Sequence, residues 1–159
     1  MFRSLAVALG LVVLLAACDP GSTPQGGISP GDSDSIRLRH VDAVNAARAQ
    51  AGAGPVRMSA ELNAAAETHA RDMANQQRAW HFGSDLTSPR ERAARAGYRG
   101  EIVGENLSEG SDSDLVVLRS WLDFGDTRAV IVDPSAQGIG LGWYQEPAGK
   151  IWWVQLIGT

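Results

Sequence analysis

Three histidines and one cysteine are the residues of this 159-residue chain with the most versatile chemistry. An imidazole can bind a metal ion or act as a general base near neutral pH, which makes His40, His69 and His81 candidates for both roles. Cys18 is the only cysteine, so the chain cannot form an internal disulfide. Lys150 is the only lysine and neither Ser nor Thr follows it, which excludes a Gly-Lys-Ser/Thr phosphate-binding loop.

The spacing around His69 indicates a structural role for that histidine. Leu62, Ala65, Ala66, His69 and Met73 fall on one face of a helix by the i, i+3, i+4, i+7 rule. A histidine on an apolar helix face more often packs in the core with its hydrogen bonds satisfied than it binds a ligand. We therefore expect His69 to be a core residue.

Four arginines lie close together in the middle of the chain. Arg90, Arg92, Arg95 and Arg99 could bind an anion. Glutamates are interleaved with them, at Glu91 and Glu101, and opposite charges in alternation favour a solvated helix face. We expect the solvated face.

Three tryptophans near the C-terminus, Trp143, Trp152 and Trp153, could stack on a sugar or a lipid. They fall on two predicted strands, and about half of the side chains on such a hairpin point into the core. Core packing is therefore the favoured interpretation.

The elements that position these residues follow from periodicity and capping signals. Helices are predicted over about 36–51, 59–77, 88–97 and 111–121, and strands over 139–144 and 151–157, with a further strand possible near 101–107. The third helix has the clearest start, because Ser88-Pro89-Arg90-Glu91 is a capping box with proline at the first helical position. Helices followed by a hairpin indicate an α+β domain.

Composition narrows the class of protein. The net charge is -4, the isoelectric point is about 5.3 and 44% of residues are hydrophobic, which is ordinary for a globular domain. An acidic chain without a basic patch argues against nucleic-acid binding. No apolar run approaches the roughly 20 residues that span a bilayer. We expect one domain, residues 36–159, and a monomer.

The N-terminus reads as a targeting segment. Arg3 precedes an apolar run over residues 5–17, which fits a signal peptide over residues 1–17. The run ends in Leu15-Ala16-Ala17-Cys18, which resembles the lipobox of bacterial lipoproteins. The resemblance implies that Cys18 carries acyl chains that anchor the protein in the membrane, because two or more chains bind firmly where one binds reversibly. An ordinary secretory signal with a chance cysteine is the alternative.

Residues 18–35 are then the lipidated cysteine and a tether. This stretch is rich in Pro, Gly, Ser and Asp and has one large apolar residue, Ile28. Such a composition cannot bury enough surface to offset its ordering entropy, so we expect flexibility. The expected location is the bacterial cell envelope, outside the cytoplasm; Asp19 after the cysteine leaves the choice between inner and outer membrane open.

Several segments in order now resemble the bacterial branch of the CAP superfamily, also called the SCP domain. The segments are Val44-Asn45-Ala46-Ala47-Arg48, Leu62, Ala66, His69, Asp72, Met73, Trp80-His81, Arg92, Ala96-Gly97-Tyr98, Gly104-Glu105-Asn106-Leu107, Trp121, Arg128, Gly138-Ile139-Gly140 and Trp153-Val154-Gln155. The resemblance covers about residues 40–157. It implies a three-layer α-β-α sandwich around a small, mostly antiparallel sheet.

The resemblance also implies a site. The family cavity is lined by two histidines and one or two glutamates, and some members hold zinc or another divalent cation there. His81 matches the first histidine and Glu105 the glutamate. Thr127 stands where bacterial relatives carry the second histidine, and Trp152 stands at the position we assign to the second histidine of eukaryotic members. Asp123 and Asp126 could replace it, but they fit a turn better.

We interpret the chain as a membrane-anchored CAP-domain lipoprotein that binds an envelope ligand or protein partner without catalysis. Its metal cavity would be degenerate, so no cofactor is expected, although His81 and Glu105 could hold a divalent cation such as zinc weakly. One alternative is a residual hydrolase that uses His81 and Glu105 on envelope peptide or peptidoglycan. Another is a lipid or sterol carrier.

Overall fold

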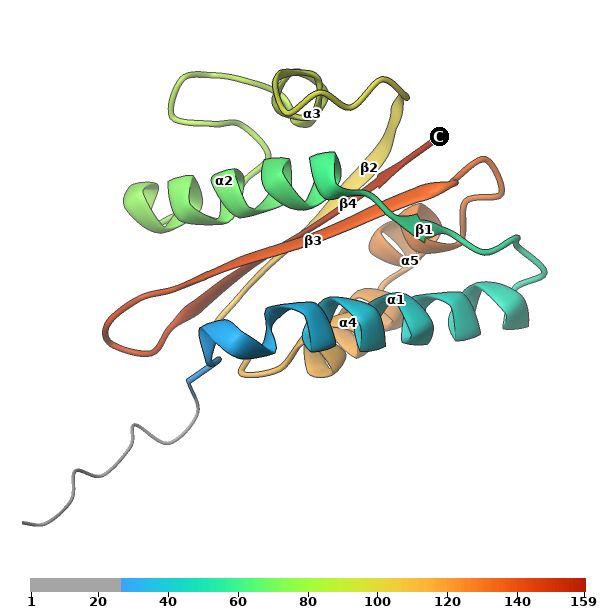
Figure 1. The fold of residues 1–159 in the computed structure, drawn as a ribbon, viewed down its shortest axis with the longest axis horizontal. Coiled ribbons are helices and arrows are strands. Elements are labelled where there is room, and N and C mark those ends of the chain that lie inside the picture. The colour runs from blue at the N-terminus through green and yellow to red at the C-terminus, as the bar shows by residue number, and fades with distance from the viewer. Residues whose placement is uncertain (1–26) are drawn as a thin grey trace, which may run out of the picture.

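The structure is a computed structural model and describes residues 27–159 (Figure 1). The predicted signal peptide, Cys18 and residues 19–26 of the predicted tether lie outside the described residues. The elements in chain order are η1 (Pro30–Asp32), α1 (Ser33–Gln50), β1 (Arg57–Met58), α2 (Ala60–Gln76), α3 (Pro89–Arg95), β2 (Ile102–Glu109), α4 (Asp114–Asp123), α5 (Gly125–Val132), β3 (Gly138–Gln145) and β4 (Ile151–Gly158). The four predicted helices and the hairpin are present.

The sheet has the strand order β1-β3-β4-β2. Its one parallel pair is β1 with β3, whereas β3 with β4 and β2 with β4 are antiparallel. Helices cover both faces, with α2 and α3 on one side and α1, α4 and α5 on the other (Figure 1). The fold is therefore an α-β-α sandwich around a small, mostly antiparallel sheet, as the resemblance implied.

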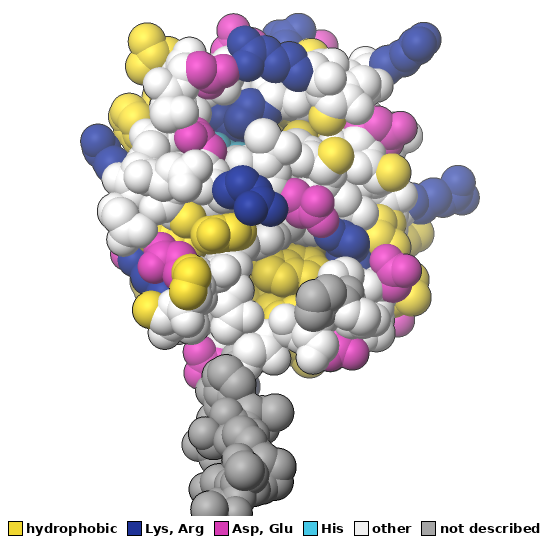
Figure 2. All heavy atoms as spheres, turned by 60° about the vertical axis from the view of Figure 1, so that its left-hand side comes forward, with side chains coloured by type: hydrophobic (Ala, Val, Ile, Leu, Met, Phe, Trp, Pro, Cys, Tyr) yellow, Lys and Arg dark blue, Asp and Glu magenta, His cyan; other side chains and the backbone are white. Residues whose placement is uncertain are grey.

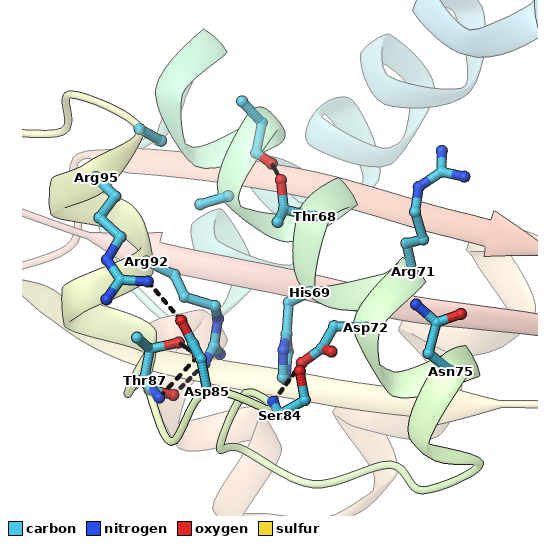
Figure 3. A pocket seen from close by; sticks show the side chains of 13 residues that line it. Thr68, His69, Arg71, Asp72, Asn75, Ser84, Asp85, Thr87, Arg92 and Arg95 are labelled. Atoms are coloured by element: carbon cyan, nitrogen blue, oxygen red, sulfur yellow. Dashed lines mark hydrogen bonds and ion pairs between the residues drawn. The ribbon is translucent and has the colours of Figure 1, made fainter.

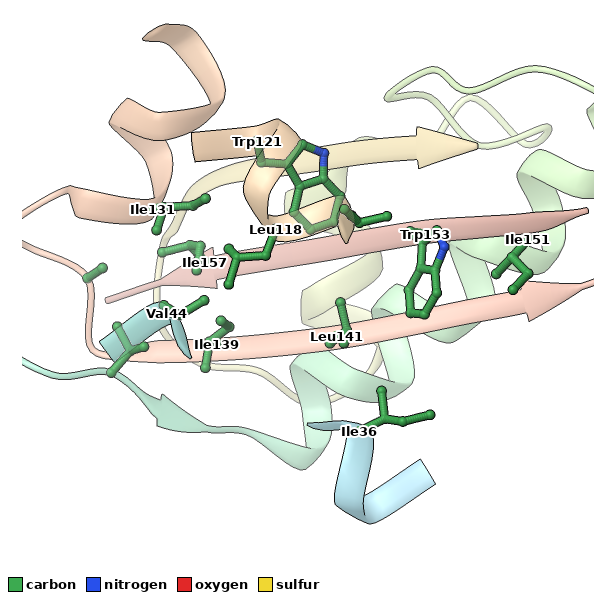
Figure 4. Packing of buried hydrophobic residues seen from close by; sticks show 13 residues of the cluster. Ile36, Val44, Leu118, Trp121, Ile131, Ile139, Leu141, Ile151, Trp153 and Ile157 are labelled. Carbon is green, nitrogen blue, oxygen red and sulfur yellow. The ribbon is translucent and has the colours of Figure 1, made fainter. Parts of the chain in front are cut away.

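The central strand β4 divides the core into two clusters. Its even-numbered residues Trp152, Val154 and Leu156 pack under α2, because alternate side chains of a strand point to opposite faces. Ile151, Trp153 and Ile157 pack on the other face, together with α1, α4 and α5 (Figure 4).

The three tryptophans of the hairpin belong to this packing. Trp152 and Trp153 are fully buried, and Trp143 is half-buried against Trp153 with ring centroids 5.5 Å apart. The interpretation of these tryptophans as core residues is confirmed.

Two short elements were not predicted, β1 and α5. Strand β1 has only two residues, which is too short for a periodic signal. Helix α5 begins with Gly125 and ends in the β-branched residues Val130, Ile131 and Val132, a composition with weak helix propensity. Packing against β2 and α4 stabilises helix α5 where its own helix propensity is weak.

Helical structure begins earlier in the chain than the sequence suggested. Helix α1 starts at Ser33, inside the segment predicted as a tether. Ile28 is partly buried against the core cluster to which α1, α4 and α5 contribute, and its backbone N–H donates to Oε1 of Gln145 over 3.0 Å. Residues 30–35 of the segment predicted as a tether are therefore helical, and Ile28 is a contact point on the sheet.

The surface shows no large segregation of charge in the view of Figure 2. Basic and acidic side chains are interspersed on this face, and hydrophobic side chains gather near its middle. Among the helices of residues 27–159, none combines the length and the apolar character needed to cross a bilayer.

Candidate functional site

Glu105 and Asn106 lie side by side in β2 and point to opposite faces of the sheet. Glu105 faces α2 and α3, opposite Leu156 in the register, and its side chain is only 1% exposed. Asn106 faces α1 and α5, where its amide donates to Oε1 of Gln155 and to the carbonyl oxygen of Thr127. A carboxylate so deeply buried requires partners, and it has them.

His81 is the first partner of Glu105. It lies in the segment between α2 and α3, and its Nδ1 is 2.9 Å from Oε1 of Glu105. A carboxylate can only accept, so Nδ1 carries the proton and Nε2 is the nitrogen left free of this bond. The hydrogen bond to Glu105 raises the pKa of His81 above 6.5, against the opposing effect of desolvation. The structure therefore brings together the two residues that the resemblance assigned to the site.

Arg92 is a second partner that the sequence did not reveal. Its Nη2 lies 2.7 Å from Oε2 of Glu105, and its Nη1 donates to the carbonyl oxygens of His81 and Thr87 over 3.0 and 2.7 Å. The side chain is 6% exposed. The expectation of a solvated face holds for Arg90 and Arg95, which form exposed ion pairs, but it is wrong for Arg92.

His69 is buried, as expected, but it borders the same carboxylate. Its Nε2 is 2.9 Å from the carbonyl oxygen of Trp80 and 3.8 Å from Oε1 of Glu105. Because a carbonyl oxygen only accepts, Nε2 carries the proton. Desolvation lowers the pKa of His69, so the imidazole stays neutral at physiological pH. The helical pattern predicted its burial but contained no signal for its neighbour on β2.

Thr127 and Trp152, which stand at the two positions of the second family histidine, make hydrogen bonds away from Glu105. The hydroxyl of Thr127 lies 2.6 Å from the carbonyl oxygen of Trp121, to which it donates. Trp152 is buried under α2 and its Nε1 donates to Oε1 of Glu146. Asp123 and Asp126 are exposed at the α4–α5 junction. None of these four has a hydrogen bond to Glu105 in the described structure.

A second polar group lies on the other face of the sheet. Gln155 accepts from Asn106 and donates from Nε2 to Nε2 of His40 over 2.9 Å. Nδ1 of His40 is 3.9 Å from Oδ2 of Asp114, and both side chains are fully buried. Burial lowers the pKa of His40 to about 4, so this histidine is a neutral structural residue.

The residues around Glu105 do not fit a divalent cation as they are arranged. Both carboxylate oxygens accept hydrogen bonds, and one of the donors is a guanidinium that is always charged. His69 and His81 each direct a protonated nitrogen toward a protein oxygen. Within residues 27–159, no group of three or more His, Cys, Asp or Glu side chains is placed to hold a metal.

A pocket of about 550 Å³ opens beside this carboxylate, between α2, α3 and the loop that precedes α3 (Figure 3). His69 and Arg92 lie in its wall. Its other lining residues are mostly polar or small: Ala64, Ala65, Thr68, Arg71, Asp72, Asn75, Ser84, Asp85, Thr87, Arg95 and Ala96. Asp72 accepts from the backbone N–H of Ser84 over 2.7 Å, which fixes the loop to α2.

Comparisons with known proteins place the fold and the family. An outer surface protein of Borrelia burgdorferi superposes with a TM-score of 0.71 at 15% identity, over 80% of this chain and 94% of that one. An extracellular SCP-domain protein of Bacillus anthracis gives 0.70 at 18% identity, and a cysteine-rich secretory protein of Staphylococcus aureus gives 0.60 at 10% identity. They cover 84% and 79% of this chain, which spans only 44% and 39% of theirs.

No curated protein matches the chain significantly. At these identities the structural neighbours show the fold alone. The model of the cysteine-rich secretory protein family, CAP, matches residues 41–157, which is most of the described chain. The protein belongs to the CAP family.

Proposed function

We propose that the protein is a lipid-anchored, extracytoplasmic CAP domain that acts as a monomeric, non-catalytic binding module, with the pocket between α2 and α3 as its ligand site. The observation that carries this proposal is the state of Glu105. Its side chain is 1% exposed and both of its oxygens are engaged, so it is poorly available to a substrate. The adjacent pocket is open, and polar side chains line part of a wall whose exposed surface is largely apolar.

The chemistry of the pocket wall favours a ligand of low net charge that carries both apolar and hydrogen-bonding groups. Arg95 pairs with Asp85 over 2.6 Å, and Arg92 pairs with Glu105, so these charges are already compensated. Arg71 lies over the ring of Tyr144, 4.8 Å from its centroid. The hydroxyl of Thr68 donates to the carbonyl oxygen of Ala64 over 2.9 Å and can still accept, and the amide of Asn75 also lines the pocket.

Blocking the pocket tests the ligand site. Thr68 is exposed on α2 and lines the pocket, so Thr68→Trp is expected to fill it without disturbing the core. Ala129→Trp, at an exposed position of α5 on the other side of the sheet, is the matched control. Soluble peptidoglycan fragments titrated into labelled protein are expected to shift the amide signals of 64–75 and 84–96 in the native chain and the control only. Shifts that survive Thr68→Trp unchanged would place the ligand elsewhere.

The anchor rests on the lipobox at Cys18, outside the described residues. The names of two structural neighbours, an outer surface protein and an extracellular protein, agree with a location outside the cytoplasm. Cys18→Ala is expected to move the protein from the membrane fraction to the soluble fraction. A variant that stays with the membrane contradicts lipidation.

Hydrolysis is a second candidate, favoured by the exposure of His81. Its side chain is 58% exposed, and Glu105 holds Nδ1 so that Nε2 is left to act as a base. Any turnover of peptide or peptidoglycan found for this protein should then fall by orders of magnitude in Glu105→Gln. Unchanged turnover removes this candidate.

A further inference from the structure

We propose that Arg92 serves as an internal counter-cation that keeps metal ions out of a latent three-donor site made by His69, His81 and Glu105. The inference goes beyond ligand binding in the pocket. It concerns whether a guanidinium or a metal ion neutralises the buried carboxylate of Glu105, and it identifies Arg92 as the residue that decides this.

The latent donors converge on one oxygen. Oε1 of Glu105 is 2.9 Å from Nδ1 of His81 and 3.8 Å from Nε2 of His69. Two imidazoles and a carboxylate form a donor set that suits zinc, and neutral imidazoles can bind it after a change of tautomer. The sequence resemblance assigned His81 and Glu105 to the family cavity but gave no role there to His69. The third donor is therefore visible only in the structure.

Arg92 already supplies Glu105 with the positive charge that a metal ion would bring. Its guanidinium lies 2.7 Å from Oε2 of Glu105 and cannot lose its charge. The carbonyl oxygens of His81 and Thr87 fix the same group, so it cannot swing away without leaving a buried acceptor at Thr87 and a part-buried acceptor at His81 unpaired. A divalent ion at Oε1 would sit next to this positive charge in a buried setting, where repulsion is screened weakly.

The arrangement also sets the protons on the two histidines. Glu105, already neutralised by Arg92, accepts a proton-bearing nitrogen from His81 and leaves Nε2 of His69 to the carbonyl of Trp80. Removing Arg92 leaves a buried carboxylate without its guanidinium partner, and a bound metal ion would then compensate that charge.

Metal titration of variants tests the proposal. The full chain carrying Cys18→Ala is titrated with zinc against a chromogenic chelator and with cobalt by visible absorption. The protein with Arg92 intact is expected to show no site that depends on His81. Arg92→Ala is expected to bind zinc at least about tenfold more tightly than the protein with Arg92 intact. Arg95→Ala, which removes an exposed arginine from the same helix, is the matched control and should gain nothing.

The gain in zinc affinity of Arg92→Ala must depend on all three donor side chains. Adding His69→Gln, His81→Ala or Glu105→Gln to Arg92→Ala should abolish it. If Arg92→Ala is unfolded without metal, zinc but not magnesium should restore its circular dichroism spectrum. The proposal is overturned by stoichiometric zinc binding in the presence of Arg92 that is lost on His81→Ala. It is equally overturned if Arg92→Ala neither gains affinity nor is refolded by zinc.

Discussion

Burial and exposure assign different roles to the two central residues, Glu105 and His81. The carboxylate side chain is 1% exposed and the imidazole that it holds is 58% exposed. A buried acceptor with two donors orients its partners and is itself hard to reach, whereas the exposed imidazole meets solvent and ligands. Any acid–base behaviour that a ligand encounters should therefore come from His81, tuned by Glu105.

The first prediction concerns the pKa of His81. Because Glu105 stabilises the protonated imidazole, the pKa is expected above 6.5 in the native chain and lower in Glu105→Gln. The stabilisation from this pair is present below the unfolded pKa of about 6.5 and is lost as the pH rises through the higher folded value. Titration of the histidine ring signals by NMR measures this.

His69 provides the internal control for that titration. Its pKa is lowered by desolvation, so its ring signals should titrate at a lower pH than those of an ordinary histidine and of His81. A His81 pKa at or below 6.5, or one that is unchanged by Glu105→Gln, would show that the hydrogen bond does not govern this residue.

At the scale of elements, the short helix α3 positions Arg92 and depends on its cap. Oγ of Ser88 accepts from the N–H of Glu91, and Oε2 of Glu91 accepts from the N–H of Ser88. A helix of seven residues has little stability of its own, so loss of the cap matters. Ser88→Ala is expected to reduce the free energy of unfolding by about 1 kcal/mol in urea titrations. Ser88→Asp can still cap the helix and should retain most of the free energy of unfolding. Equal losses of unfolding free energy in the two variants would refute the capping argument.

The seating of α2 on β3 depends on glycines. A Cβ at Gly142 would lie 2.2 Å from the backbone nitrogen of Glu67, so the helix would have to move. Gly142→Ala is expected to cost roughly 1–3 kcal/mol of unfolding free energy, measured by urea denaturation. Gly54→Ala, where a Cβ meets nothing within 4 Å, should change it by less than about 0.5 kcal/mol. Similar effects in the two variants would contradict the close approach.

Sequence patterns predicted the elements better than the site. The 3.6-residue period of α2 and the capping box of α3 are local signals, and both helices formed as expected. The position of Arg92 inside the molecule is not local, because it depends on Glu105, 13 residues away on a different element. The charge alternation around Arg92 even favoured the opposite prediction. His69 likewise acquires its role only when α2 packs on the sheet that carries Glu105.

At the scale of the whole molecule, a buried polar chain links strands β2 and β4 of the sheet to helices α1 and α4. Asn106 on β2, Gln155 on β4 and His40 on α1 are joined by hydrogen bonds of 3.0 and 2.9 Å. Asp114, at the start of α4, lies 3.9 Å from Nδ1 of His40 and pairs with Arg39. Polar groups so buried specify the register between layers, because a shifted packing would leave them unpaired. The neutral state of His40 is part of this arrangement.

Global stability should consequently depend on the protonation of His40. Its pKa is about 4 in the folded chain and about 6.5 in the unfolded chain, so between these values the unfolded state binds the extra proton. Stability therefore falls as the pH is lowered, by roughly 2 kcal/mol between pH 7 and pH 5 from this residue. The charge of Asp114 opposes this lowering of the His40 pKa and that of Arg39 adds to it, but desolvation is the largest cause.

Urea denaturation of the native chain and of His40→Gln at both pH values isolates the effect of His40, since His69 and His81 titrate in both proteins. The variant is expected to lose most of the pH dependence attributed to His40, and equal slopes in the two proteins would show that the buried chain tolerates a charged imidazole.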